Sequence, residues 1–364
     1  MIRRLLKGFG AHLDGFLLAA LITLMAVGLV VLYSASGQNV DKVASQALNM
    51  LVALAVMWAV ANVPPQHLIR LALPTYVLGL GLLVAVALFG EVSHGARRWL
   101  HLGVTRIQPS ELMKIAIPLM LAWYFDRYQA VLRLKHYGIA ACLFLVPVGL
   151  IARQPDLGTA LLIIASGFYV LFLAGLPWRV MVGLLALFAA SMPLLWSLLH
   201  DYQRQRILTL LNPSLDPLGA GYHTIQSTIA IGSGGIFGKG WLKGTQAHLD
   251  FLPESATDFI FAVFGEEFGL VGGLLLLTLF LVITARGLAI AANAPTLASR
   301  LLAGSITFTF FTYAFVNMGM VAGILPVVGV PLPLVSYGGT SMVTVLLGFG
   351  ILMSIQTHKK LVKT

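Results

Sequence analysis

Apolar runs separated by short polar connections repeat along almost the whole of this chain. Several runs reach the ~20 residues that an α-helix needs to cross a bilayer. The pattern predicts about ten spans, at residues 14–36, 46–63, 68–89, 109–125, 137–152, 157–175, 178–199, 258–284, 301–323 and 338–356. We therefore expect an all-α, polytopic transmembrane helical bundle in which residues 1–364 form a single membrane domain. One long outer loop, at about 200–257, separates spans 7 and 8.

The composition excludes a soluble fold. Hydrophobic residues make up 59% of the 364 and charged residues 10%, whereas soluble domains carry about 25% charged residues. The net charge of +10 would suggest nucleic acid in a soluble protein. Here the basic residues sit at span ends, where they set topology and meet anionic lipid. We expect membrane lipids as partners and no nucleic acid. Because Cys142 is the only cysteine, no intramolecular disulfide or cysteine metal site can form.

The basic residues also predict the orientation. With ten spans and the N-terminus inside, every inner connection carries Lys or Arg, and both termini lie in the cytoplasm. Two outer segments break the rule: residues 90–108 hold Arg97, Arg98 and Arg106, and the long loop is also basic. Most acidic residues fall outside or at the outer boundary. An anionic ligand on the outer face explains basic residues kept there.

Ionisable groups within spans are costly and are functional candidates by default. Glu111 and Lys114 lie near the outer end of the fourth span, and their i,i+3 spacing places them on one helix face. The alternative is a mutually neutralising pair that only fixes helix packing. The sequence leaves both readings open.

Three acids belong to the eighth span. Asp258 opens it, at the edge of the long loop, where a carboxylate either caps the helix or faces a cavity. Glu266 and Glu267 lie ~12 Å deeper at 1.5 Å per residue, and one helix face cannot present all three acids. We expect at least one of the two glutamates to have a structural partner, and we favour packing over catalysis for both.

Two glycine-rich segments, residues 232–240 and 323–341, do not fit the pattern of regular membrane-spanning helices. Residues 232–240 resemble a phosphate-binding loop but lack its required Gly and Ser/Thr positions. A flexible loop that approaches a ligand closely, or a simple linker, fits better. Residues 323–341 contain three prolines and many glycines, so they cannot form one regular helix. Irregular backbone near membrane depth must line a cavity or be buried in protein, which predicts an outward-facing groove.

These features alone fit an enzyme acting on an anionic lipid, a transporter or a receptor-like scaffold. Longer motifs narrow the choice. The chain resembles the shape, elongation, division and sporulation (SEDS) family over nearly its whole length, and its elongation branch in particular. The resemblance rests on Gln108-Pro109-Ser110-Glu111 with Lys114, Gln154-Pro155-Asp156-Leu157-Gly158-Thr159-Ala160, Gly219-Ala220-Gly221-Tyr222-His223, Gly238-Lys239-Gly240-Trp241, Gly244-Thr245-Gln246, Leu252-Pro253-Glu254 with Thr257-Asp258-Phe259, Ser336-Tyr337-Gly338-Gly339 and Thr357-His358-Lys359-Lys360.

The resemblance implies a SEDS fold and a peptidoglycan glycosyltransferase in the bacterial cytoplasmic (inner) membrane, with its active site facing outward. The substrate would be lipid II, joined into β-1,4 glycan strands. The partners would be a class B penicillin-binding protein, which is a transpeptidase, and the rest of the elongation machinery. Asp258 matches the family's essential aspartate and would be the general base of an inverting reaction.

Substrate-binding roles follow for other matched positions. Neutralising the leaving pyrophosphate would fall to Arg97, Arg98, Lys114 and Lys239. Glu111 and Asp156 would position Lys114 or a divalent cation, and Thr245 and Gln246 would also contact substrate. A divalent cation (Mg²⁺ or Mn²⁺) is a possible cofactor, with Asp156 and Asp258 as possible ligands. No nucleotide or redox cofactor is expected.

Two other functions remain as alternatives. A lipid II flippase would need a polar path on both sides of the membrane, whereas the acids here concentrate on one side. A non-catalytic scaffold for the penicillin-binding protein would not need Asp258.

Overall fold

The computed structural model describes residues 12–93, 96–101, 106–154, 156–198, 201–212, 220–248, 252 and 254–358. The helices are α2 (Gly15–Ala35), α3 (Val40–Ala61), α4 (Pro65–Arg70), α5 (Ala72–Phe89), α6 (Pro109–Tyr128), η1 (Gln129–Val131), α7 (Leu134–Ala152), α8 (Leu157–Leu173), α9 (Trp178–Leu198), α10 (Asp201–Leu211), α11 (Ala220–Gly234), α12 (Thr245–His248), α13 (Ile260–Ala292), α14 (Leu297–Val321) and α15 (Thr340–Thr357). Three short strands, β1 (Glu91–Ser93), β2 (Ala96–His101) and β3 (Arg106–Ile107), complete the described elements.

The helices confirm the predicted polytopic membrane fold. Within the described residues, α2, α3, α5, α7, α13, α14 and α15 are each long and apolar enough to cross a membrane. Two shorter apolar helices lie within α8 and α9. Helix α6 has 20 residues and covers the predicted fourth span, although Glu111 and Lys114 lower its hydropathy. The exact number of spans stays a prediction.

The predicted span at 68–89 is two helices in the structure. Helix α4 ends at Arg70, and α5 begins at Ala72 after a turn at Leu71. Pro74 explains the break, because it has no N–H to bond the carbonyl of Arg70 and its ring clashes with that carbonyl. Other helices begin where the sequence offers a cap. Asp14 accepts a hydrogen bond from the Leu17 N–H at 2.9 Å, and α6 starts with Pro109, which needs no donor.

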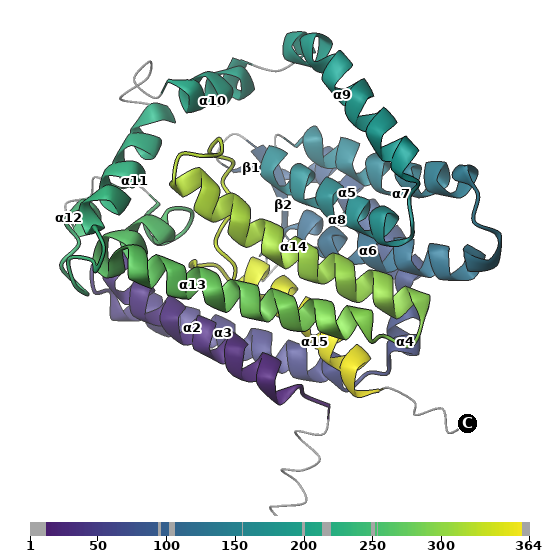
Figure 1. Ribbon diagram of the computed structural model, residues 1–364, viewed down its shortest axis with the longest axis horizontal. Coiled ribbons are helices and arrows are strands. Elements are labelled where there is room, and N and C mark those ends of the chain that lie inside the picture. Colours follow the sequence, from purple (N-terminus) through teal and green to yellow (C-terminus); the bar gives the residue numbers. More distant parts are fainter. Residues whose placement is uncertain are drawn as a thin grey trace, which may run out of the picture.

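Both consecutive helices and helices distant in sequence pack together in the core (Figure 1). Helix α13 packs against α14, α14 against α8 and α6, and α15 against α3. Aromatic rings join the central helices: Phe310 lies 5.5 Å from Phe280 and 4.9 Å from Phe349, measured between ring centroids. Helix α9 leans away from the bundle in Figure 1, and Leu185 and Leu187 on it are 68% and 66% exposed.

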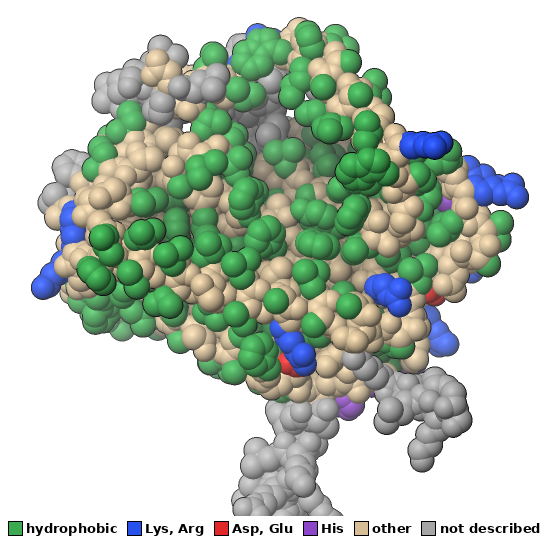
Figure 2. Space-filling model, viewed as in Figure 1, with side chains coloured by type: hydrophobic (Ala, Val, Ile, Leu, Met, Phe, Trp, Pro, Cys, Tyr) green, Lys and Arg blue, Asp and Glu red, His purple; other side chains and the backbone are tan. Residues whose placement is uncertain are grey.

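The outer surface is that of a membrane protein. Hydrophobic side chains are spread over the whole face shown in Figure 2, and the Lys and Arg side chains lie mainly near its edges. Lipid is the solvent in which so much apolar surface is stable. The two segments predicted as outer loops are partly ordered. Strands β1, β2 and β3 form a small antiparallel sheet, and helices α10, α11 and α12 lie within residues 200–257.

Candidate functional site

A cavity of about 310 Å³ opens beside Asp258, immediately before α13. Its wall combines two acids, a histidine and two threonines with apolar groups. The lining residues are Thr209, Leu210, His223, Thr224, Glu254, Asp258, Phe259, Pro326, Val327 and Gly329. The cavity therefore joins the segment between α9 and α13, the start of α13 and the proline-rich segment (residues 323–341), which lines a cavity as predicted. That this cavity faces outward stays a prediction.

The backbone around Asp258 is held by residues far along the chain. Three successive carbonyls, at 256–258, accept hydrogen bonds from α14 and from the proline-rich segment. The Tyr337 N–H donates to the first at 2.9 Å, the Ser336 Oγ to the second at 2.6 Å, and the Asn317 Nδ2 to the third at 2.8 Å. The position of Asp258 thus depends on long-range contacts as well as on its own helix.

A second cavity, of about 210 Å³, holds basic and acidic side chains. The Lys114 Nζ lies 2.6 Å from Oε1 of Glu111, so the predicted helix-face pair is confirmed. The guanidinium of Arg98 lies 3.9 Å from Oδ1 of Asp156, and the Gln108 Nε2 donates to the other oxygen of that carboxylate at 3.2 Å. Each cation lies beside a carboxylate: the Lys114 contact is hydrogen-bonded, whereas the Arg98 contact is at ion-pair distance only.

The two cavities share Gly329, which lines both of them. Its φ of +71° favours glycine, and a Cβ at this position would lie 3.4 Å from the Asp258 Oδ2. The proline-rich segment therefore forms the wall between Asp258 and the pocket of Arg98 and Lys114. A carboxylate on one side and fixed cations on the other suit acid–base chemistry beside an anionic leaving group.

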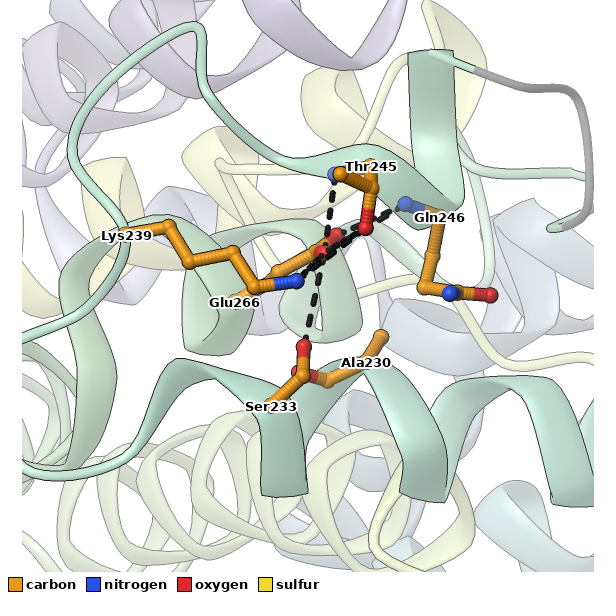
Figure 3. A network of polar contacts seen from close by, with 6 residues as sticks. All are labelled: Ala230, Ser233, Lys239, Thr245, Gln246 and Glu266. Atoms are coloured by element: carbon orange, nitrogen blue, oxygen red, sulfur yellow. Dashed lines mark hydrogen bonds and ion pairs between the residues drawn. The ribbon is translucent and has the colours of Figure 1, made fainter.

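Lys239, Thr245 and Gln246 meet at a different place, around Glu266 (Figure 3). The Lys239 Nζ lies 2.7 Å from Oε1 of Glu266, whose side chain is fully buried. The same carboxylate accepts hydrogen bonds from the N–H and Oγ1 of Thr245, at 2.8 and 2.9 Å, and from the Gln246 N–H. None of the three lines the two cavities described above. Their predicted contact with substrate stays a prediction.

The neighbouring Glu267 also has structural partners. Its Oε1 accepts a hydrogen bond from the Leu242 N–H at 3.1 Å and another from the Ser34 hydroxyl. The prediction that at least one of these glutamates has a structural partner is confirmed, for both. We name residues Gly235 to Gln246, together with Glu266 and Glu267, the loop anchor.

Helix α13 is interrupted at Gly269 (φ +64°, ψ −163°), and the loop anchor fills the interruption. The N–H groups of residues 239 and 240 donate to the carbonyls of Glu266 and Glu267 at 3.0 Å. In return, the N–H groups of residues 270 and 271 donate to the carbonyls of residues 235 and 236. The glycine-rich segment was expected to approach a ligand or to be a linker. In the structure its backbone approaches α13.

The possible metal ligands Asp156 and Asp258 do not come together in the described structure, and the role of Arg97 stays a prediction. Arg97 lies in β2, but its side chain is outside the described part of the chain. Asp156 and Asp258, the possible metal ligands, line separate cavities. Among the described residues, no group of three or more His, Cys, Asp or Glu side chains could hold a metal ion. The described donors therefore do not form a metal site from protein ligands alone.

His223 also lines the Asp258 cavity, a position that its sequence context does not predict. Its ring stacks on Phe259, with centroids 5.5 Å apart and planes 15° apart. Burial lowers the pKa of His223, and the negative charge of Glu254 only partly offsets that effect. The residue belongs to a motif that carried the family resemblance, but only the fold places it beside Asp258.

Comparison with known proteins identifies the family. The family described as "Cell cycle protein", comprising the FtsW, RodA and SpoVE types, matches residues 15–361. The chain belongs to this family. Among its curated relatives, "Peptidoglycan glycosyltransferase MrdB" of Escherichia coli (strain K12) is 52% identical over 351 residues, which cover 96% of this chain and 95% of the relative. "Peptidoglycan glycosyltransferase RodA" of Treponema pallidum is 33% identical, over 95% of this chain and 98% of the relative.

Solved structures agree with this assignment. A chain from the structure described as "Structural coordination of polymerization and crosslinking by a peptidoglycan synthase complex" superposes with a TM-score of 0.82 at 36% identity, covering 94% of this chain and 97% of the other. The rod shape determining protein RodA of Thermus thermophilus gives a TM-score of 0.72 at 31% identity, covering 94% and 96%. The predicted resemblance to the RodA type of this family is confirmed.

Proposed function

We propose that this FtsW/RodA/SpoVE family member is a peptidoglycan glycosyltransferase that polymerises lipid II into β-1,4 glycan strands. The single observation that carries the proposal is the arrangement around Gly329: a cavity with Asp258 on one side, and a pocket with Arg98 and Lys114 on the other. The names of relatives that are 52% and 33% identical over nearly the whole chain support the same activity.

In the proposed reaction, Asp258 accepts the proton of the 4-hydroxyl of the acceptor sugar. That oxygen forms a bond to the anomeric carbon of the donor sugar, while the bond from this carbon to the pyrophosphate oxygen breaks. The pyrophosphate leaves with the electron pair, and attack from the opposite face inverts the anomeric centre. Fixed cations at the leaving group stabilise its growing negative charge without reorganising. We assign that task to Arg98 and Lys114, with Glu111 and Asp156 holding them in place.

We keep a divalent cation in the proposal only as an ion bound jointly by a protein carboxylate and the phosphates of the substrate. Mg²⁺ usually binds to one or two carboxylates together with the phosphates of a substrate. Asp156 or Asp258 would supply such a carboxylate, and the ion would add positive charge at the pyrophosphate. No step assigned to the residues above depends on it. Direct substrate contacts by Arg97, Lys239, Thr245 and Gln246 remain proposals of the same kind.

We place the enzyme in the cytoplasmic (inner) membrane of a bacterium, with both termini inside and the two cavities facing outward. The distribution of Lys and Arg supports this orientation. We further propose a class B penicillin-binding protein of the elongation machinery as its partner. The likeness to a chain of a complex described as coordinating polymerization and crosslinking supports that choice.

The test uses the purified protein with its class B partner, whose transpeptidase site is blocked, and labelled lipid II with Mg²⁺ or Mn²⁺. We expect glycan polymer from the wild type. Asp258→Asn should lower the rate by about 10²- to 10⁴-fold, as expected when a general base is lost. Complex formation should be unchanged.

The outcomes separate the alternatives. A folded wild-type complex that makes no polymer would reject the glycosyltransferase and favour a lipid II flippase or a non-catalytic scaffold. Equal polymer from wild type and Asp258→Asn would keep the enzyme but remove Asp258 as the base. Loss of polymer with normal complex formation would reject the scaffold.

A further inference from the structure

Asn317 is an uncharged polar residue buried near the C-terminal end of α14, with 0% of its surface exposed. Its Nδ2 donates two hydrogen bonds, to the Asp258 carbonyl at 2.8 Å and to the Val330 carbonyl at 2.7 Å. An amide nitrogen has two protons, so both are used. Because both partners are carbonyl oxygens, the nitrogen and not the oxygen of the side chain must face them.

The first bond satisfies a carbonyl that lies just outside the helical ladder. Helix α13 begins at Ile260, so the carbonyls just before it are not yet part of the regular i to i+4 ladder. The Asp258 carbonyl is bonded instead by a side chain 59 positions later in the chain. A buried carbonyl without a partner is costly. The bond from Asn317 therefore favours one conformation of the backbone that carries the Asp258 carboxylate.

The second bond fixes the wall between the cavities. Val330 follows Gly329, and both line the pocket of Arg98 and Lys114. The proline-rich segment has no regular ladder of its own near this point, so side-chain contacts must define its path. Leu332 further along is held in the same way, since its N–H donates to the Ser336 Oγ at 2.8 Å.

We propose that Asn317 is a positioning residue: its amide ties the Asp258 backbone to the Gly329–Val330 wall, and so sets Asp258 relative to the pocket of Arg98 and Lys114. This role rests on the proposed glycosyltransferase activity. Asn317 is too deeply buried to contact substrate, and it acts through the two backbone segments that it holds. Its loss should impair the chemical step rather than substrate binding, because misplacing a reacting group by ~1 Å can cost ~10²-fold in rate.

The same helix supplies a matched control. Ser305 is also 0% exposed, and its Oγ donates to the Ser166 carbonyl of α8 at 2.8 Å. It lies about 18 Å from Asn317 along the helix axis, at 1.5 Å per residue. Removing this bond weakens the packing of α14 without touching the backbone near Asp258. Ser305→Ala therefore reports what a purely structural loss does to activity.

The experiment measures initial polymerisation rates against lipid II concentration for the wild type, Asn317→Leu, Asn317→Asp and Ser305→Ala, each in complex with the class B partner. Asn317→Leu removes both bonds. Asn317→Asp keeps the shape and can donate one bond when protonated. We expect kcat to fall by about 10²-fold for Asn317→Leu, with KM within about threefold. The rate of Asn317→Asp relative to wild type should rise as the pH is lowered. Ser305→Ala should keep the wild-type kcat.

Thermal unfolding and partner binding, measured on the same samples, identify variants that have lost the fold. A folded Asn317→Leu with wild-type kcat would overturn the positioning role, and so would an Asn317→Asp whose rate relative to wild type did not change with pH. So would a loss confined to KM, or an equal loss of kcat in Ser305→Ala. If wild-type protein makes no polymer, the proposed function itself fails, and the role of Asn317 fails with it.

Discussion

Two carboxylates close together in the sequence, Glu266 and Asp258, are held in opposite ways. The Glu266 side chain is fully buried, and its carboxylate is bonded by Lys239, Thr245 and Gln246. At Asp258 the protein holds the backbone, and the residue lines a cavity. A carboxylate surrounded by protein hydrogen-bond donors stabilises the structure. A carboxylate whose backbone is held so that the residue lines a cavity can contact a ligand.

The strongest test of this contrast is Glu266→Gln. The substitution keeps the size of the side chain but leaves the Lys239 ammonium without its counter-charge. Breaking a buried ion pair costs about 3–5 kcal/mol; we expect about 2–3 kcal/mol here because Lys239 is partly exposed, which weakens the pair. Thermal unfolding in detergent should show the loss. At temperatures below its unfolding transition, Glu266→Gln should lose far less polymerisation activity than Asp258→Asn.

A control from the same network is Ser233→Ala. The Ser233 Oγ lies 3.4 Å from Oε1 of Glu266, a long contact, so its removal should change unfolding little. If Glu266→Gln unfolded at the wild-type temperature yet made no polymer, Glu266 would belong to the active site, and the contrast with Asp258 would be wrong.

Gly329→Ala tests the cavity side of the comparison, with a smaller effect. A residue other than glycine pays about 1–2 kcal/mol in this backbone conformation, and the new methyl would contact the Asp258 carboxylate. We expect polymerisation to fall about tenfold, since ~1.4 kcal/mol corresponds to a factor of ten, with partner binding intact. Initial rates with labelled lipid II measure the change.

Gly175→Ala separates backbone strain from the contact with Asp258. Gly175 also has a positive φ, of +88°, and a Cβ there would meet only the Tyr137 hydroxyl, at 3.9 Å. This variant should lose similar stability but polymerise normally. Equal rate losses in the two glycine variants would mean that strain alone, and not the wall beside Asp258, lowers the rate.

The smallest expected effect is a pH dependence at His223. Burial lowers the pKa of His223 in the folded protein, so the unfolded chain binds the proton more readily. Folding stability from this group is therefore complete above its ordinary pKa of about 6.5 and decreases as the pH falls below that value. Unfolding temperatures from pH 7.5 to 5.5 should fall more steeply for wild type than for His223→Asn. Parallel curves would contradict this expectation.

Short-range patterns predicted most of the fold. The hydrophobic runs located the long helices, and the i,i+3 spacing of Glu111 and Lys114 placed them on one helix face, where they form an ion pair. The geometry of a single helix was enough to predict a structural partner for Glu266 or Glu267. These predictions succeeded because each depends on residues within a few turns of one another.

The sequence did not predict the contacts between segments that are far apart in the chain. No local signal pairs the loop anchor with the interruption at Gly269, because the bonds join positions about thirty residues apart. The role of Asn317 was also missed. Its sequence signal, an uncharged amide within an apolar run, is weaker than that of an ionisable residue in a span. Its two partners become visible only when α14 lies beside the start of α13.

The contact between the loop anchor and α13 has a consequence for how this part of the protein can evolve. At this contact, and at Gly234 just before it, backbone meets backbone with no room for side chains. A Cβ at Gly234 would lie 2.1 Å from the Gly265 carbonyl oxygen, one at Gly238 2.1 Å from the Glu267 carbonyl oxygen, and one at Gly269 2.3 Å from the Gly238 nitrogen. Substituting any one of these glycines separates the two segments, and no second substitution can refill the gap. We therefore expect all three positions to stay glycine during evolution, although none of them lines the Asp258 cavity or the pocket of Arg98 and Lys114.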